Sequence, residues 1–392
     1  MKYRLRIISW GGIMARIAGM ACMVVLASCV HPTESTTDFI FQIKKASHAE
    51  GFQWRMWQDA QQSRVCLEIR NPGDSKILAT VYRDSATWSS DAHRSETAVV
   101  LGPPERGLAT LSTTHLALIS AWDSACFHWS GGAYTEFIRW EPALGKLARS
   151  EARDIGGKPE VDREKLLALR PAALTTYPFG DPLEGVNVRQ EIPVVPILEY
   201  LESHPLGRAE WMRVMGWMMG ELPARQADVK FQQVADSYER LRLDLAQKPM
   251  KPRVFTGSVQ QGTWHAPGSK SFIARLLADA GLDYIVDADS ERDNVKVPLE
   301  EMIVLSQSAD AWGLVLHHPE TLTRASFLDS DERHAMLLPP THQVFVANTA
   351  QCDYFGWWVA RPDVMLENLV TLFDDNHPWS YDVEPCFEWI AE

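Results

Sequence analysis

The feature that most constrains this sequence is one long amphipathic helix, predicted for residues 224–248. Apolar residues recur along it at intervals of four, three, four, three and four, which is the spacing of a single stripe on a helix. The stripe consists of Ala227, Phe231, Val234, Tyr238, Leu241 and Leu245. Pro249 ends the pattern. Roughly 25 residues at about 1.5 Å each make a rod of about 37 Å, which is long for a connector inside one domain.

Before this helix, the sequence has the pattern of hairpins followed by α/β structure. The runs "VCLEIRNPG" and "ILATVYRDS" predict antiparallel strands divided by an Asn-Pro-Gly turn. From Gly107 the pattern changes to strand and helix, beginning with "RGLATLSTTH" and "LALISAW". Asp162 can cap a short helix that Pro171 ends, and "AALTT" after it predicts a buried strand.

After the long helix the α/β pattern begins again. "PRVFTG" predicts a strand, "SVQQGTWHAPG" a loop, and "SKSFIARLLADAG" a helix that Ser269 or Ser271 opens and Gly281 closes. "AWGLVLHH" and "HQVFVANTA" predict two more buried strands, and "RPDVMLENLVTLF" a helix with Pro362 in its first turn. The expected fold class is therefore α/β, with two α/β lobes joined by a single long backbone helix. A length of 392 residues suits two domains.

The first 29 residues have the layout of a secretory signal. A basic stretch that contains two possible starts, Met1 and Met14, precedes the short apolar run "IAGMACMVVLA", which is too short to span a bilayer. The run ends in "LASC", which resembles a bacterial lipobox, so we expect Cys29 to be the lipidated first residue of the mature protein. An ordinary signal peptide with a coincidental cysteine is the alternative.

These patterns divide the chain into five parts. They are a lipoprotein signal peptide (1–29), a polar tether (30–50), an N-terminal lobe (51–223), the connecting helix (224–249) and a C-terminal lobe (250–392). The expected location is the cell envelope, with contact to a membrane through the lipid anchor only. Val30, the residue after the expected lipidation site, does not decide whether the anchor lies in the inner or the outer membrane.

Four cysteines remain in the predicted mature chain: Cys66, Cys126, Cys352 and Cys386. They form no CxxC pair, which removes the usual support for a zinc or thioredoxin-like site. An oxidising compartment permits disulfides such as Cys352 with Cys386, although the sequence alone does not assign the pairing.

Charge and motifs narrow the function classes. A formal net charge of −13 argues against a nucleic-acid partner, because a surface that follows phosphates needs a basic excess. The sequence contains no GxSxG, P-loop, HExxH or GxGxxG pattern. We therefore expect neither an enzyme nor a resident cofactor.

Several stretches, taken in order, resemble the substrate-binding proteins of bacterial ABC importers for iron–siderophore complexes, haem and cobalamin. They are "DREKLLALRP", "IPVVPILEYLESHPLGRAEW", the long helix, "GTWHAPGSKSFIARLLADAGLDY" and "RPDVMLENLV". The resemblance covers nearly everything after residue 100. It implies that the lobes hold a bulky iron complex, haem or a corrinoid in the cleft between them and deliver it to an ABC permease. "HPLGRAEW", residues 204–211, then leads into the helix before the connector, an architectural role.

Candidate ligand contacts follow from the rule that ligands bind at the carboxyl ends of parallel strands. In the N-terminal lobe these ends offer Ser112, Thr114, His115, Trp129, Tyr134, Tyr177 and Phe179. In the C-terminal lobe they offer Trp264, His265, His317, His318, Tyr354 and Trp357. Tyr177 is singled out by the resemblance, which places an aromatic residue against the ligand there. The alternative for each aromatic residue is simple packing under a loop.

The adjacent histidines, His317 and His318, raise the possibility of a metal site. Neighbouring side chains at a strand end point in opposite directions, so both cannot easily reach one ion. We expect one histidine to face the cleft and the other to serve the structure.

The resemblance also implies one surface glutamate per lobe that docks on the permease. The matching positions are Glu164 and Glu300, with Glu301 as the alternative to the second. Acidic residues in a first helical turn also complement the helix dipole, and that is the structural alternative. Two other functions stay open: a metallochelatase-like enzyme on the same scaffold, and a surface lipoprotein that captures haem or siderophores without a permease.

Overall fold

Helix α6 (Glu221–Leu245) is the long helix that the sequence predicts. Of the predicted stripe, Leu241 is half-buried and the other residues are buried. The helix begins three residues before the predicted start. Gly220, at φ 114°, adopts a backbone conformation that a side chain would strain. Pro223 fits in the first turn, because the N–H groups there have no partner within the helix.

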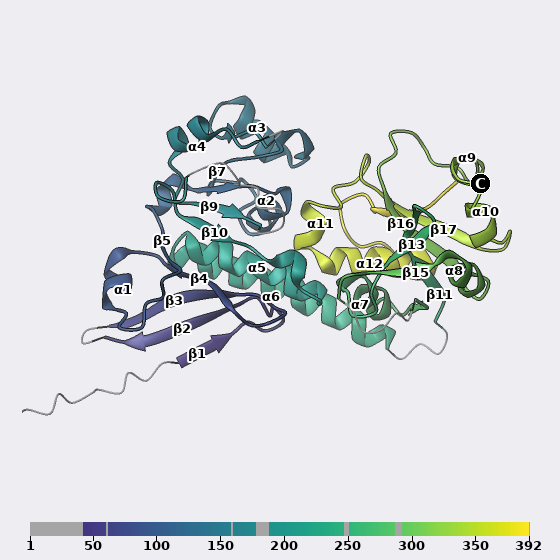
Figure 1. The fold of residues 1–392 in the computed structure, drawn as a ribbon, viewed down its shortest axis with the longest axis horizontal. Helices are drawn as coiled ribbons and strands as arrows, with labels where there is room; N and C mark the ends of the chain where they lie inside the picture. The colour runs from purple at the N-terminus through teal and green to yellow at the C-terminus, as the bar shows by residue number, and fades with distance from the viewer. Residues whose placement is uncertain are drawn as a thin grey trace, which may run out of the picture. The chain divides into compact units, whose positions relative to one another are not determined.

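The computed structural model describes residues 42–59, 62–157, 160–177, 188–246, 251–286 and 292–391 (Figure 1). Within these residues the N-terminal lobe contains two sheets. The first has the order β1-β2-β3-β4-β5 and consists of β1 (Gln42–Lys45), β2 (Phe52–Gln58), β3 (Ser63–Arg70), β4 (Ile77–Tyr82) and β5 (Ala98–Val100). The second has the order β10-β9-β6-β7-β8 and consists of β6 (Leu108–Thr110), β7 (Trp129–Gly132), β8 (Arg153–Asp154), β9 (Ala173–Thr176) and β10 (Val194–Pro196).

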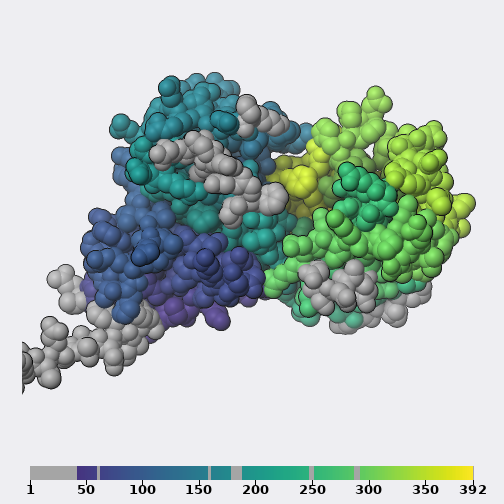
Figure 2. Space-filling view, viewed as in Figure 1, coloured from purple at the N-terminus to yellow at the C-terminus, as the bar shows by residue number. Residues whose placement is uncertain are grey.

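The first sheet is antiparallel from β1 to β4, so the predicted hairpin of β3 and β4 is confirmed. All strand pairs of the second sheet are parallel. Their carboxyl ends therefore lie along one edge, which is where a ligand site is expected in α/β folds. Figure 2 shows the surface that residues 42–100, in purple and blue, contribute to this lobe.

The C-terminal lobe has a mixed sheet and a small antiparallel sheet. The mixed sheet has the order β14-β11-β16-β17-β18 and consists of β11 (Arg253–Thr256), β14 (Asp283–Tyr284), β16 (Ala311–Leu316), β17 (Gln343–Asn348) and β18 (Phe387–Trp389). The small sheet consists of β12 (Ser258–Gln260), β13 (Thr263–Pro267) and β15 (Asn294–Pro298). "SVQQGTWHAPG" was expected to be a loop, and this prediction is wrong. The segment forms the β12–β13 hairpin, and β13 pairs with β15.

Short helices cover both lobes: α1 (Ser85–Ser90), α2 (Thr113–Ser120), α3 (Glu141–Ala148), α4 (Arg163–Leu169), α5 (Pro205–Met218), α7 (Phe272–Asp279), α8 (Leu299–Ser306), α9 (Arg324–Ser330), α10 (His334–Leu337), α11 (Trp357–Ala360) and α12 (Pro362–Phe373). Asp162 caps α4 and Ser271 caps α7, as predicted. Pro362 is the first residue of α12, where its missing N–H costs no intrahelical bond.

Helix α5 contains most of "HPLGRAEW", and two buried carboxylates, Glu210 in α5 and Glu202 just before it, hold the start of the described chain. Glu210 accepts hydrogen bonds from the backbone N–H groups of residues 47, 48 and 49 at 2.7–2.9 Å. Glu202 accepts from the N–H groups of residues 50 and 51 and from the Trp211 indole. The predicted tether, 30–50, is therefore ordered structure from β1 onward. Its polar composition hid the fact that its backbone is bound by side chains more than 150 residues away.

Contacts of α5 and α6 connect the two lobes. Helix α12 packs along α6, α7 and α11 contact α5, and α2 contacts α11. One continuous apolar core runs from Phe52 in β2 through α5 and α6 to α12. Helix α2 follows β6, and α11 follows β17. The contact between α2 and α11 therefore brings together the carboxyl ends of the β6–β10 sheet and of the mixed sheet of the C-terminal lobe. The predicted two-lobe α/β fold is confirmed.

Candidate ligand-binding site

A buried polar cluster lies at the carboxyl edge of the sheet formed by β6–β10. His115, in the first turn of α2, has no solvent exposure. Its Nδ1 is 3.0 Å from the Thr175 hydroxyl, and its Nε2 is 3.7 Å from Oε2 of Glu199. Thr114 donates a hydrogen bond of 2.6 Å to the other Glu199 oxygen, Oε1. Ser112, the N-cap of α2, lies beside Thr114, with 2.8 Å between their hydroxyl oxygens.

Glu199 is held in its ionised form. Burial alone opposes ionisation, but His115, Arg208 and Thr114 outweigh it and lower the pKa of the carboxyl below its usual range. The cluster therefore places a buried negative charge behind the strand ends, with one carboxylate oxygen bonded by Thr114 and the other facing His115 without a hydrogen bond.

Two tyrosines continue the cluster outward. Tyr177, directly after β9, packs edge-on against His115 with 6.5 Å between the ring centroids. Burial, followed by a hydrogen bond with Tyr134, raises the pKa of Tyr177 to about 12, so its hydroxyl stays protonated. Tyr134 follows β7 with φ 55°, a conformation that costs energy for a residue with a side chain. This strained turn holds the Tyr134 ring next to Tyr177.

Arg208 is the residue that the sequence analysis missed. It lies in α5, and its guanidinium stacks over the Phe272 ring of α7 at 4.3 Å. Its Nε is buried without a hydrogen-bond partner in the described part of the chain. Burial lowers the pKa of Arg208, while Glu199, Tyr354 and Glu202 act to raise it. Arginine stays charged in proteins, so this is a partly buried cation with one buried, unpaired donor. In "HPLGRAEW", predicted to be architectural, His204 caps α5 and Leu206, Ala209 and Trp211 are buried in the core.

Arg208 lines a cavity of about 380 Å³ in the C-terminal lobe. Most of the wall is apolar and comes from α7, α12, the second half of β16 and Phe345 of β17. Tyr354 and Phe355, from the loop after β17, close one side with their rings in edge-to-face contact at 5.0 Å. His265, on β13, also lines the cavity. A volume of this size is within the range of small-molecule sites, about 300–1,000 Å³.

Together these side chains form a row, which we call the interlobe row. It consists of Tyr134, Tyr177, His115, Glu199, Arg208, Tyr354 and Phe355. Tyr134, Tyr177, His115 and Glu199 are neighbours through hydrogen bonding, ring packing and the approach of imidazole to carboxylate, and Tyr354 packs against Phe355. Arg208 interacts with Glu199 and Tyr354 electrostatically, without a direct hydrogen bond or ion pair. The row starts in the N-terminal lobe, passes through α5 and ends in the C-terminal lobe.

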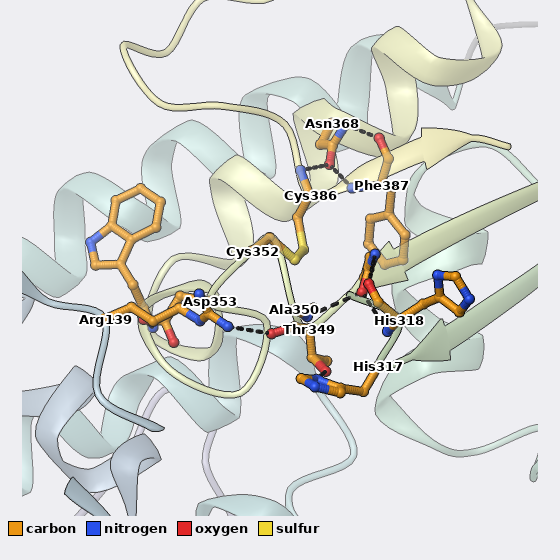
Figure 3. Close-up of a disulfide and its surroundings, with 12 residues drawn as sticks. Arg139, His317, His318, Thr349, Ala350, Cys352, Asp353, Asn368, Cys386 and Phe387 are labelled. Carbon is orange, nitrogen blue, oxygen red and sulfur yellow. Dashed lines mark hydrogen bonds between the residues drawn. A yellow bond between two sulfur atoms is a disulfide. The ribbon is translucent and has the colours of Figure 1, made fainter. Parts of the chain in front are cut away.

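The loops of both lobes also meet directly at Arg139 and Thr349 (Figure 3). Arg139, from the loop after β7, donates a 2.9 Å hydrogen bond to the carbonyl oxygen of Thr349, after β17. His317 is exposed, and its Nδ1 is 3.1 Å from the Thr349 hydroxyl. His318 turns away, with its Nδ1 2.8 Å from the carbonyl oxygen of Glu320. The two histidines do not share a site, and the described residues contain no group of three His, Cys, Asp or Glu side chains able to hold a metal.

Comparison with known proteins identifies this architecture. Residues 131–337, slightly more than half of the chain, match the family model described as periplasmic binding protein. The chain belongs to the periplasmic binding protein family. The first sheet, β1–β5, lies outside the matched range.

Individual relatives of this periplasmic binding protein are distant. An uncharacterized lipoprotein of Methanocaldococcus jannaschii is 24% identical over 296 residues, covering 72% of this chain and 67% of the relative. A periplasmic haem-binding protein from Pseudomonas aeruginosa is similar in structure with a TM-score of 0.53 and 14% identity, covering 73% of this chain and 98% of that one. The siderophore-binding protein FhuD from Vibrio cholerae, bound to Fe³⁺-Desferal, has a TM-score of 0.50 and 15% identity, covering 68% and 98%.

The family and the lipoprotein relative indicate an extracytoplasmic, envelope-associated protein with a small ligand and a transport role. Among the described residues, no helix combines the length and apolar character that crossing a bilayer requires. Cys29 and Phe179 lie outside the described residues.

The structure separates the remaining predicted site residues. Trp129 and Trp264 have no solvent exposure, and their indole N–H groups donate to Thr110 and to the carbonyl oxygen of Thr256. Both side chains are packed in the core, which was the alternative to ligand contact for each aromatic residue. Trp264 is buried because its segment forms a hairpin rather than the expected open loop. Trp357, the first residue of α11, is half-buried beneath Arg361, whose guanidinium carbon is 5.1 Å from the ring centroid.

The loop after β17 is fixed by a disulfide between Cys352 and Cys386, one of the pairings that the sequence permits (Figure 3). The backbone N–H groups of Cys386 and Phe387 both donate to the Asn368 side chain. The C-terminal end of the bridge is therefore held independently by α12. The disulfide accordingly restrains mainly the loop that carries Tyr354, Phe355 and Trp357.

Removing this disulfide is expected to destabilise the protein. For Cys352→Ser with Cys386→Ser, closure of a 34-residue separation predicts a loss of about 3–4 kcal/mol. Thermal melting with and without reductant measures it. Reductant should lower the melting temperature of the wild type and leave the double variant unchanged, because the other described cysteines, Cys66 and Cys126, are free thiols. A double variant that melts like the oxidised wild type would contradict this.

Proposed function

We propose that this protein is the solute-binding lipoprotein of an ABC importer, and that it captures a bulky iron complex, haem or a corrinoid between its two lobes. The observation that carries the proposal is the interlobe row. Both lobes and α5 contribute to it, and it combines aromatic faces with a buried carboxylate and a partly buried guanidinium. Aromatic walls with a few oriented polar groups suit a large planar or chelate ligand.

The structural relatives support the ligand class. The Pseudomonas aeruginosa protein is a haem-binding protein, and the Vibrio cholerae protein holds a ferric siderophore. At 14% and 15% identity, the structural similarity supports a shared fold only. Binding measurements are needed to choose between haem, a siderophore and a corrinoid. In this proposal the protein is exported and anchored through lipidated Cys29, so the polar segment after Cys29 leads from the membrane to β1.

The test is a titration of the apo protein with haem, cobalamin and several ferric siderophores, followed by tryptophan quenching. Trp357 and Trp358, next to the loop of Tyr354 and Phe355, provide intrinsic reporters. We expect one ligand to bind at micromolar or lower concentration, reversibly and without turnover. Absence of binding by all of them, together with tight binding of bare zinc or manganese, would overturn the proposed ligand class. Metal insertion into a porphyrin would favour the chelatase alternative.

A further inference from the structure

The cavity in the C-terminal lobe has a composition that restricts what can occupy it. Its deep wall is made of aliphatic and aromatic side chains, among them Ile273 and Leu276 of α7, Leu369 of α12 and Phe345 of β17. Several of its uncharged polar side chains come from the β12–β13 hairpin and the start of β15, as with Gln260 and Asn294. The interior therefore favours an apolar group.

Arg208 is the only arginine or lysine among the described residues that line this cavity. Its side chain makes no hydrogen bond or ion pair with any described residue, and its Nε is buried. A guanidinium has five N–H donors in a planar arrangement that fits a carboxylate or another oxyanion. The buried Nε has lost its hydrogen bond to water without gaining another acceptor, and an anion at the cavity would supply that acceptor.

The nearby carboxylates do not fill this role. Oε1 of Glu199 accepts from Thr114, and Oε2 lies 3.7 Å from Nε2 of His115 without a hydrogen-bond partner among the described residues. Neither oxygen lies within ion-pair distance of Arg208. Both oxygens of Glu202 accept from the backbone N–H groups of residues 50 and 51, one of them also from Trp211. These charges stabilise the cation electrostatically but leave its donors available.

We propose that the cavity binds an apolar arm of the ligand and that Arg208 binds an anionic group next to that arm. The ligand would thus be amphiphilic: an acyl or aromatic substituent attached to, or close to, a carboxylate or similar oxyanion. This inference rests on the proposed function, since the cavity serves as one part of the binding site. It assigns Arg208 to ligand specificity rather than to the fold.

Octanoate and octan-1-ol serve as the probes, because they share an alkyl chain and differ in charge. Calorimetric titration of the wild-type protein is expected to show saturable, submillimolar binding of octanoate and at least tenfold weaker binding of the alcohol. In Arg208→Gln the octanoate affinity should fall about tenfold, so that the preference disappears, whereas Arg208→Lys should keep it. Arg240→Gln, an exposed change on α6, is the matched control and should behave like the wild type.

Filling the cavity tests its location. Val315, at the end of β16, lines the cavity and is 41% exposed, so a larger side chain can be placed there without disturbing the core. Val315→Trp should reduce binding of both probes at least tenfold, and Val229→Trp, at an exposed position of α6, should not. Melting curves of each variant verify folding.

Failure of this inference is distinct from failure of the proposed function. Equal binding of octanoate and octan-1-ol by the wild type, an unchanged preference in Arg208→Gln, or full binding by Val315→Trp would each overturn the inference, even if haem or a siderophore binds. If octanoate binds as expected but no iron complex, haem or corrinoid does, the inference about the cavity and Arg208 is supported. The proposed ligand class is then wrong.

Discussion

Replacing Glu210 by alanine is expected to destabilise the protein by about 3–5 kcal/mol, the cost of breaking a buried charged interaction by removing one partner. Glu210 has no solvent exposure and accepts the backbone N–H groups of Ser47, His48 and Ala49. It also receives a 2.6 Å hydrogen bond from Arg213. Alanine would leave these donors without a partner, and the segment leading into β2 would detach from α5.

Thermal melting measures this effect. With about 2.1 cal/mol/K of unfolding entropy per residue, a loss of this size lowers the melting temperature of this chain by about 4–7 °C. Glu210→Gln keeps the side-chain shape and one acceptor oxygen, so its melting temperature should fall less than that of Glu210→Ala. Glu164→Ala, at an exposed position, is the control and should change stability by at most about 0.5 kcal/mol. An unchanged melting temperature for Glu210→Ala would show that residues 47–51 are not held by this carboxylate.

Replacing Glu164 and Glu300 together by alanine is expected to abolish uptake while leaving ligand binding intact. Both glutamates are exposed, and each lies in the first turn of a short helix, α4 in the N-terminal lobe and α8 in the C-terminal lobe. One exposed carboxylate per lobe provides two separate points for docking on basic pockets of a permease. Charges of this kind govern association and orientation more than stability. We therefore propose them as the permease contacts.

Uptake of the identified ligand by cells that carry the double variant is the measurement, with affinity and melting temperature determined on the purified protein. Glu105→Ala with Glu332→Ala, exposed glutamates of the two lobes, is the matched control and should transport normally. Glu301, also exposed beside Glu300, is replaced in a further variant. Normal uptake by the Glu164/Glu300 variant would remove the docking role. Lost ligand binding would instead place these carboxylates in the ligand site.

The long helix could be predicted because its signal is local. A stripe at helical spacing over roughly 25 residues specifies one buried face, and five of its six predicted members are buried. The caps Asp162 and Ser271 are local for the same reason, since each accepts from an N–H three residues ahead. The predicted strands β9, β11, β16 and β17 are short apolar runs bounded by turn residues.

Features that depend on distant partners could not be predicted. Strand β13 exists because it pairs with β12 on one side and with β15, about 30 residues later, on the other. The segment before β2 is held by Glu202 and Glu210 of a region far along the chain. Arg208 has no motif around it. Its significance arises from α7 and the loop after β17 packing beside α5, and from the absence of a carboxylate within ion-pair distance among the described residues.

The central claim, that both lobes contact one ligand, is tested most directly by hydrogen exchange with and without the ligand that binds most tightly in the titration. The account predicts protection in the N-terminal lobe at residues 112–115 and 134–139, and in the C-terminal lobe at 257–265 and 349–357. The hairpin of β3 and β4 should exchange equally in both states. Protection confined to one lobe, or protection of β3 and β4 in place of the strand ends, would contradict the account.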